Sequence, residues 1–146
     1  MTSWKETCER LDAAVISWTA RHGTDFLRIA LGIVFIWFGA LKVLKVSPVA
    51  DLVGQTVYWV RPEVAVPFLG WWEALVGLGL IFRKALRTVL FLLFLQMSGT
   101  FLVLVMHPDL SFQAGNIFKL TLVGEFVVKN IVLIAAGLVI ARTVKR

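Results

Sequence analysis

The chain has 146 residues, 59% of them hydrophobic, and its mean hydropathy of +0.85 is too high for a soluble domain of this size, so it belongs to the membrane class. Its single cysteine, Cys8, excludes an internal disulfide and a multi-cysteine metal site. The net charge of +6 could suggest a nucleic-acid partner, but its distribution along the chain indicates membrane orientation instead, and we expect no such partner.

The first predicted element is an amphipathic helix over residues 3–22, within an N-terminal segment 1–25. Five residues recur at spacings of four and three and therefore share one helical face: Trp4, Cys8, Leu11, Val15 and Trp18. Charged residues occupy the opposite side. Tryptophan at both ends of the apolar stripe is typical of a helix that lies in the headgroup region, so we predict an interfacial helix. Packing of the same face on the rest of the protein is equally compatible with the pattern.

Residues 26–146 are predicted to form a four-helix transmembrane domain, because four apolar runs are each long enough to cross a bilayer. The predicted spans cover about residues 26–44, 64–82, 86–106 and 122–141. In the first long loop, residues 49–60 could form a short interfacial helix with Tyr58 and Trp59 at the membrane surface. The predicted fold is therefore all-α, an integral membrane four-helix bundle with an N-terminal amphipathic interfacial helix.

The distribution of lysine and arginine predicts the orientation of the bundle. Four spans place both termini on one side of the membrane, and that side carries ten of the fifteen basic residues. The opposite side carries four, and Lys129 lies within the fourth span. By the positive-inside rule, we expect a multi-pass protein of the cell (inner) membrane with both termini in the cytoplasm.

Polar side chains inside the spans are the candidate functional residues: Lys42, Glu73, Gln96, Glu125, Lys129 and Asn130. A charge near mid-bilayer costs roughly 2.5–3.5 kcal/mol on insertion scales, so these groups should face protein or a water-filled cavity. At about 1.5 Å per helical residue, they lie at overlapping depths in the outer half of the bilayer. We therefore predict a charge-balanced polar centre made by two lysines and two glutamates: Lys42 and Lys129 against Glu73 and Glu125.

Such a centre has two interpretations. It could be an ion-pair network that only sets the helix register, or it could bind a small polar or anionic molecule or a quinone head group. In either case Lys129→Met should destabilise the bundle, because it leaves a glutamate buried without a partner. Arg28 and His107 are secondary candidates, because Arg28 could instead be a topology anchor and His107 could instead mark the end of a helix. The tryptophans Trp37, Trp71 and Trp72 are assigned to packing or to the interfacial belt. We expect no metal site.

The motifs of these spans resemble a known family. Residues 28–42, Arg-Ile-Ala-Leu-Gly-Ile-Val-Phe-Ile-Trp-Phe-Gly-Ala-Leu-Lys, look like the first-helix pattern of the DoxX-like membrane proteins, including their YkgB-like relatives. Gly70-Trp-Trp-Glu73 with Gly77 resembles their second-helix motif. Gln96-x-x-Gly-Thr-Phe101 and Phe126-Val-Val-Lys-Asn-Ile-Val-Leu133 resemble their third- and fourth-helix motifs. The resemblance covers roughly residues 26–141 and implies a four-helix membrane bundle whose motif residues here are Arg28, Lys42, Glu73, Gln96, Lys129 and Asn130.

The resemblance also implies a function. Some relatives are described as subunits of a thiosulfate:quinone oxidoreductase, and others are linked to resistance to thiol oxidative stress. It therefore implies a membrane subunit of a quinone-linked or thiol/sulfur redox assembly, with a redox partner protein. The sequence contains no redox centre of its own, so we expect no intrinsic cofactor and at most a non-catalytic or quinone-binding subunit of an oxidoreductase. A small-solute (anion) carrier or permease acting as a homo-oligomer, and a structural scaffold, remain the alternatives.

Overall fold

The computed structural model describes residues 2–48, 50–56 and 60–144. Over these residues the secondary structure is helical apart from turns and one isolated β-bridge, between Phe112 and Leu120. Four of the described helical segments are long and apolar enough to cross a membrane. The prediction of an all-α membrane bundle with four spans is confirmed.

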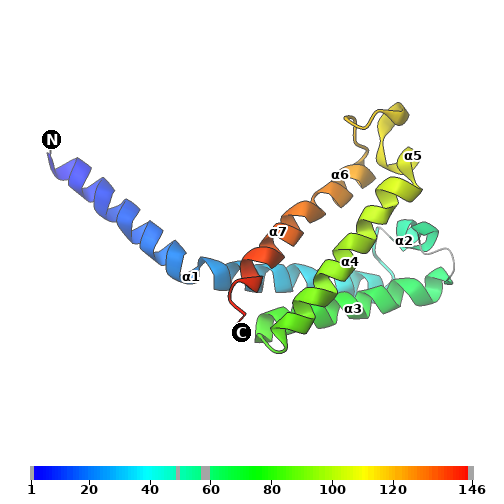
Figure 1. Cartoon of the computed structure of the whole chain (residues 1–146), viewed down its shortest axis with the longest axis horizontal. Coiled ribbons are helices and arrows are strands. Elements are labelled where there is room, and N and C mark those ends of the chain that lie inside the picture. The colour runs from blue at the N-terminus through cyan, green and yellow to red at the C-terminus, as the bar shows by residue number, and fades with distance from the viewer. Residues whose placement is uncertain (1, 49, 57–59, 145–146) are drawn as a thin grey trace.

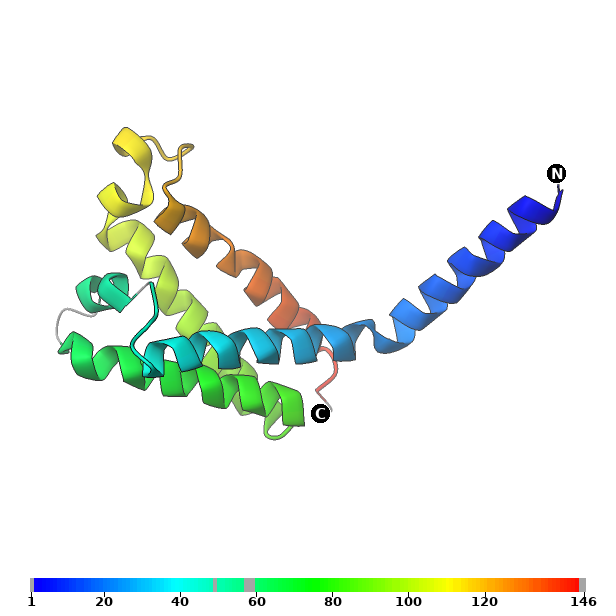
Figure 2. The same ribbon diagram turned by 180° about the vertical axis from the view of Figure 1, so that it is seen from behind.

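The first helix, α1 (Thr2–Val43), is continuous through the predicted boundary between an interfacial helix and the first span. Residues 23–25 are Gly-Thr-Asp, without a proline, so nothing removes a donor from the hydrogen-bond ladder there. Figures 1 and 2 show that its N-terminal part projects away from the bundle, while its C-terminal part packs along α3. The apolar stripe of the projecting part is exposed, from Trp4 (80%) to Trp18 (58%). Contact of that stripe with lipid stays a prediction.

Glycines bring α1 into close contact with α3 (Pro62–Phe82), which runs antiparallel to it (Figure 1). A Cβ atom added at Gly32 would lie 2.8 Å from the carbonyl oxygen of Gly77. One added at Gly70 would lie 2.7 Å from the carbonyl oxygen of Gly39. Real Cβ atoms essentially never come so close to a backbone oxygen, so only glycine permits this approach of the two helices.

The second helical pair consists of α4 (Leu86–Met106) and the fourth span, which crosses the first pair obliquely (Figure 2). The fourth span is interrupted at Lys129, between α6 (Leu122–Val128) and α7 (Asn130–Ala141). The amide of Val132 donates to the carbonyl of Lys129, so the helix tightens for one turn at this point. The predicted boundaries of the third span, residues 86–106, agree with α4.

Short elements close the end of the bundle that is remote from the termini. They are α2 (Ala50–Thr56), α5 (Pro108–Ser111) and the 3-10 helix η1 (Gln113–Gly115). Of the predicted interfacial helix over residues 49–60, α2 is present, whereas Tyr58 and Trp59 lie outside the described residues. The connection from α3 to α4 is a tight turn in which Arg83 and Ala85 have positive φ angles of 57° and 47°.

The interior of the bundle differs between its two ends. At the end near the termini, a continuous apolar core joins α1, α3, α4 and α7 through side chains such as Leu31, Leu80, Leu93 and Ile140, all at most 5% exposed. Toward the other end, α4 and the fourth span diverge from α1 and α3 (Figure 2), and polar residues replace aliphatic ones. The candidate site therefore lies where the core stops.

Candidate functional site

A cavity of about 410 Å³ lies between the four long helices and α2. Its walls are mainly aromatic and aliphatic, with Phe35 and Phe38 from α1, Phe68 and Trp72 from α3, and Leu133 from α7. Five polar residues of the spans also line it: Lys42, Glu73, Gln96, Thr100 and Asn130. The cavity thus combines a large apolar surface with a compact polar group.

The first polar set joins three helices. Nζ of Lys42, in the last turn of α1, donates to Oε2 of Glu73 on α3 at 2.6 Å. Nε2 of Gln96 on α4 donates to Oε1 of the same carboxylate, also at 2.6 Å. The side chains of Lys42 and Glu73 are only 8% and 10% exposed. Each carboxylate oxygen therefore has its own donor, and the buried pair is electrically neutral.

Backbone packing explains why this pair forms. The nearest side-chain atom to a Cβ at Gly70 would be the Cβ of Lys42, at 2.9 Å. The glycine contact between α1 and α3 therefore places Lys42 directly beside the turn that precedes Glu73. A larger residue at Gly70 would separate the helices and with them the two charges.

The second polar set joins the third and fourth spans. Nδ2 of Asn130 on α7 donates to Oγ1 of Thr100 at 2.9 Å, and that hydroxyl donates to the carbonyl of Met97 at 2.7 Å. Thr100 lies four residues after Gln96, so both polar sets contact the same face of α4, one turn apart. Asn130 itself is 8% exposed.

Glu125 and Lys129 do not join the polar centre, and the predicted arrangement of two lysines against two glutamates is corrected on this point. Both residues are exposed, and neither lines the cavity. The ion pairs among the described residues involve neither of them. The reason is the rotation of the fourth span about its axis: Val127 and Asn130 face the bundle, which turns residues 125 and 129 outward. The stability effect predicted for Lys129→Met therefore loses its structural basis.

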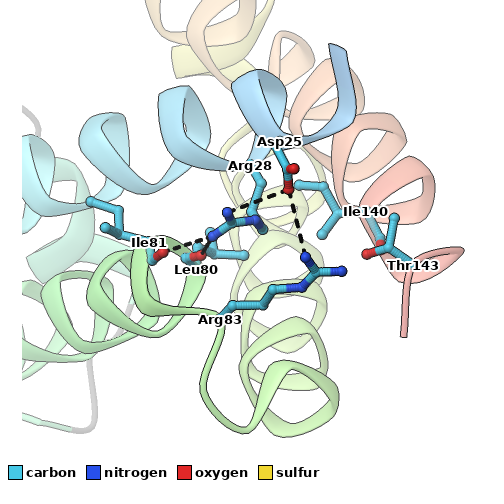
Figure 3. Close-up of polar contacts among 7 residues, drawn as sticks. All are labelled: Asp25, Arg28, Leu80, Ile81, Arg83, Ile140 and Thr143. Atoms are coloured by element: carbon cyan, nitrogen blue, oxygen red, sulfur yellow. Dashed lines mark hydrogen bonds and ion pairs between the residues drawn. The ribbon is translucent and has the colours of Figure 1, made fainter. Parts of the chain in front are cut away.

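The two secondary candidates lie outside the cavity. His107 is the C-cap residue of α4 and the N-cap residue of α5, as expected for a helix end. Arg28 lies at the opposite end of the bundle, where its guanidinium donates to the carbonyls of Leu80 and Ile81, the latter at 2.7 Å. Figure 3 shows this contact together with Asp25, which lies 3.5 Å from Arg28 and 3.8 Å from Arg83. Arg28 thus caps the C-terminus of α3, where a cation is favourable.

Replacing Arg28 by methionine should lower the free energy of unfolding by about 2 kcal/mol, because two backbone carbonyls lose a charged donor. Unfolding in mixed detergent micelles would measure the change. Arg21→Met is the matched control, since Arg21 is on the exposed part of α1 and should change stability little. Equal stabilities of the Arg28→Met and Arg21→Met proteins would contradict the capping role.

Sequence reasoning missed two parts of the site. Trp72, assigned to packing or the interfacial belt, lines the cavity, and its ring lies 6.1 Å from that of Phe68. Phe68 and Trp72 are four residues apart and therefore share a helical face, and Trp72 directly precedes Glu73. This spacing was the sequence pattern that could have placed Trp72 in the site. Leu52 and Val53 of α2 also form part of the wall, although the loop was expected only at the membrane surface. Trp37 and Trp71, in contrast, are 66% and 60% exposed.

Two buried polar atoms of the cavity residues have no hydrogen-bond partner among the described residues: Nε1 of Trp72 and Oε1 of Gln96. The first is a donor and the second is an acceptor. Buried polar groups are nearly always paired, and exceptions often mark a site where a ligand or water binds. Two residues that line the cavity therefore each carry a buried polar atom with unused hydrogen-bonding capacity, a donor in Trp72 and an acceptor in Gln96.

Comparison with known proteins identifies a family for this chain. A family model described as DoxX matches residues 23–108, which is more than half of the chain. This segment includes Lys42, Glu73 and Gln96, whereas Asn130 lies beyond it. No curated protein and no solved structure gives a significant match.

Proposed function

The chain belongs to the DoxX family of membrane proteins, and from that premise we propose that it is the quinone-binding membrane subunit of a redox assembly. The observation that carries the proposal is the cavity of about 410 Å³, with apolar walls and a polar cluster of Lys42, Glu73 and Gln96. Its volume falls within the range of about 300–1,000 Å³ typical of small-molecule sites. A polar ring with an apolar tail is complementary to such a surface.

The charge of the site favours a neutral ligand over an anion. Lys42, the cation in the cavity wall, is already neutralised by Glu73 at 2.6 Å. Lys129, which an anion carrier was expected to use as a second cation, is exposed and outside the cavity. No observation therefore supports the carrier alternative. The scaffold alternative, in which the ion pair only sets the helix register, does not account for the cavity beside that pair.

The residues of the site would bind and orient the head group. Lys42 and Glu73 are hydrogen-bonded at 2.6 Å, so a proton can pass between them, and both line the cavity in which a ligand oxygen would lie. The apolar walls exclude water from the tail of the ligand. A bound quinone would supply the redox chemistry by accepting two electrons and two protons. The electrons would come from a partner protein that carries a redox centre.

The proposed orientation places the termini in the cytoplasm and the cavity in the outer half of the inner membrane. Basic residues at the terminal end of the bundle support it, including Arg28 and Arg83 in Figure 3. The exposed apolar stripe of the projecting part of α1 would then lie on the inner membrane surface.

Extraction of quinones from gently purified protein tests the proposal. We expect a near-stoichiometric quinone in the parent and in Trp71→Leu, whose replaced ring is exposed. Trp72→Leu should retain about fivefold less, because the cavity loses an aromatic wall. A parent protein that contains no quinone and binds no added short-chain quinone would refute the proposed function.

A further inference from the structure

We propose that the cavity binds the reduced, hydroxyl-bearing form of its ligand, a quinol, in preference to the oxidised quinone. This inference rests on the proposed function. It follows from the two unpaired polar atoms of the wall, Nε1 of Trp72 and Oε1 of Gln96. A quinone oxygen only accepts hydrogen bonds, whereas a quinol hydroxyl both donates and accepts.

The orientation of the Gln96 amide determines which group it offers to a ligand. Its Nε2 donates to Oε1 of Glu73 at 2.6 Å, and Lys42 holds the other carboxylate oxygen. Turning the amide over would place its oxygen against a carboxylate oxygen, where two acceptors meet and repel. The ion pair therefore commits the nitrogen to Glu73 and leaves Oε1 of Gln96 as an acceptor.

The unpaired acceptor, Oε1 of Gln96, is the feature of the site that distinguishes a quinol from a quinone. Oε1 of Gln96 is already shielded from water and has no partner in the structure, so a ligand without a donor leaves the cost of its desolvation in place. A quinol hydroxyl removes this cost by donating to it. A quinol hydroxyl can also accept a hydrogen bond from Nε1–H of Trp72, and a quinone carbonyl can do the same. Trp72 thus serves both redox forms, whereas Gln96 discriminates between them.

The preference has a consequence for the direction of electron flow. If the quinol binds about tenfold more tightly than the quinone, the reduction potential of the bound couple rises by about 30 mV for a two-electron step. Quinone plus two electrons and two protons gives quinol, so the site would favour reduction of the quinone by electrons from the partner. This makes Gln96 the residue that determines specificity for the redox form.

The test measures binding of three probes to the full chain in detergent micelles: decylubiquinone, decylubiquinol, and the dimethyl ether of decylubiquinol. The parent should bind the quinol about tenfold more tightly than the quinone. The dimethyl ether has no hydroxyl donor, so it should bind no better than the quinone. Because the parent and the three probes suffice for this comparison, it does not depend on the folding of any variant.

Two variants separate the roles of the polar atoms. Gln96→Leu should remove the preference by weakening quinol binding about tenfold, with little change for the quinone. Trp72→Phe, which keeps an aromatic ring but lacks the N–H donor, should weaken both forms alike and leave their ratio unchanged.

The possible failures are distinguishable. Quinone binding as tight as that of the quinol, or a dimethyl ether that binds like the quinol, would overturn this inference while the proposed function stands. A protein that binds none of the three probes would overturn both.

Discussion

Lys42→Met should destabilise the bundle by about 3–5 kcal/mol, because it leaves the Glu73 carboxylate buried without its charged partner. Glu73 is 8% exposed, and its remaining side-chain donor, Nε2 of Gln96, is neutral. Methionine keeps most of the volume of the lysine stem, so the loss reports on the ion pair rather than on a void. The free energy of unfolding in mixed detergent micelles is the quantity to measure.

Two controls make this result specific. Lys129→Met removes the outward-facing lysine of the fourth span and should not lower stability, because a charge turned toward lipid is unfavourable. The double variant Lys42→Met with Glu73→Gln removes both charges, and it should recover most of the loss. If the Lys42→Met and Lys129→Met proteins unfold alike, the ion pair does not have the structural role that its geometry indicates.

Gly39→Ala should cost about 3 kcal/mol or more, because the added methyl group would meet backbone atoms of α3 rather than a movable side chain. A Cβ at this position would collide with the carbonyl oxygen of Gly70 and lie 2.8 Å from the amide nitrogen of Ala74. The helices must separate to accommodate it. That movement would also lengthen the contact between Lys42 and Glu73, so ligand binding should fall together with stability.

Gly99 provides the matched control for this substitution. It lies within α4, and an added Cβ would meet nothing within 4 Å. Gly99→Ala should therefore leave stability unchanged or raise it by up to about 1 kcal/mol, since alanine favours the helix. Equal effects of alanine at Gly39 and at Gly99 would show that the close approach of α1 and α3 does not contribute to stability.

The residues changed in these variants belong to one structural unit. The glycine contact between α1 and α3 sets the separation at which Lys42 reaches Glu73, and Glu73 in turn orients the Gln96 amide. Contacts among three helices therefore determine the orientation of the Gln96 amide, and this orientation leaves its oxygen without a hydrogen-bond partner. A change at any of these positions should alter both stability and ligand preference, whereas changes at Trp71 or Lys129 should alter neither strongly.

The sequence by itself determined the class of the protein and its spans. Apolar runs of sufficient length predicted four crossings, and the third was predicted with the boundaries that α4 has. It also identified Lys42, Glu73, Gln96 and Asn130 as interior residues, because polar groups in such runs must avoid lipid. These inferences depend only on composition and on the cost of exposing polar groups to hydrocarbon, which are local properties of the chain.

Only the tertiary structure decided which of the polar residues meet. A spacing of four places Glu125 and Lys129 on one helical face, but it does not say which way that face points. The rotation of the fourth span is set by its contacts, with Asn130 bound to Thr100 and Val127 buried, and this turns both charges outward. The cavity and its Trp72 wall likewise arise where the pair formed by α4 and the fourth span diverges from α1 and α3. No property of a single helix determines these features, because they depend on the packing of one helix against another.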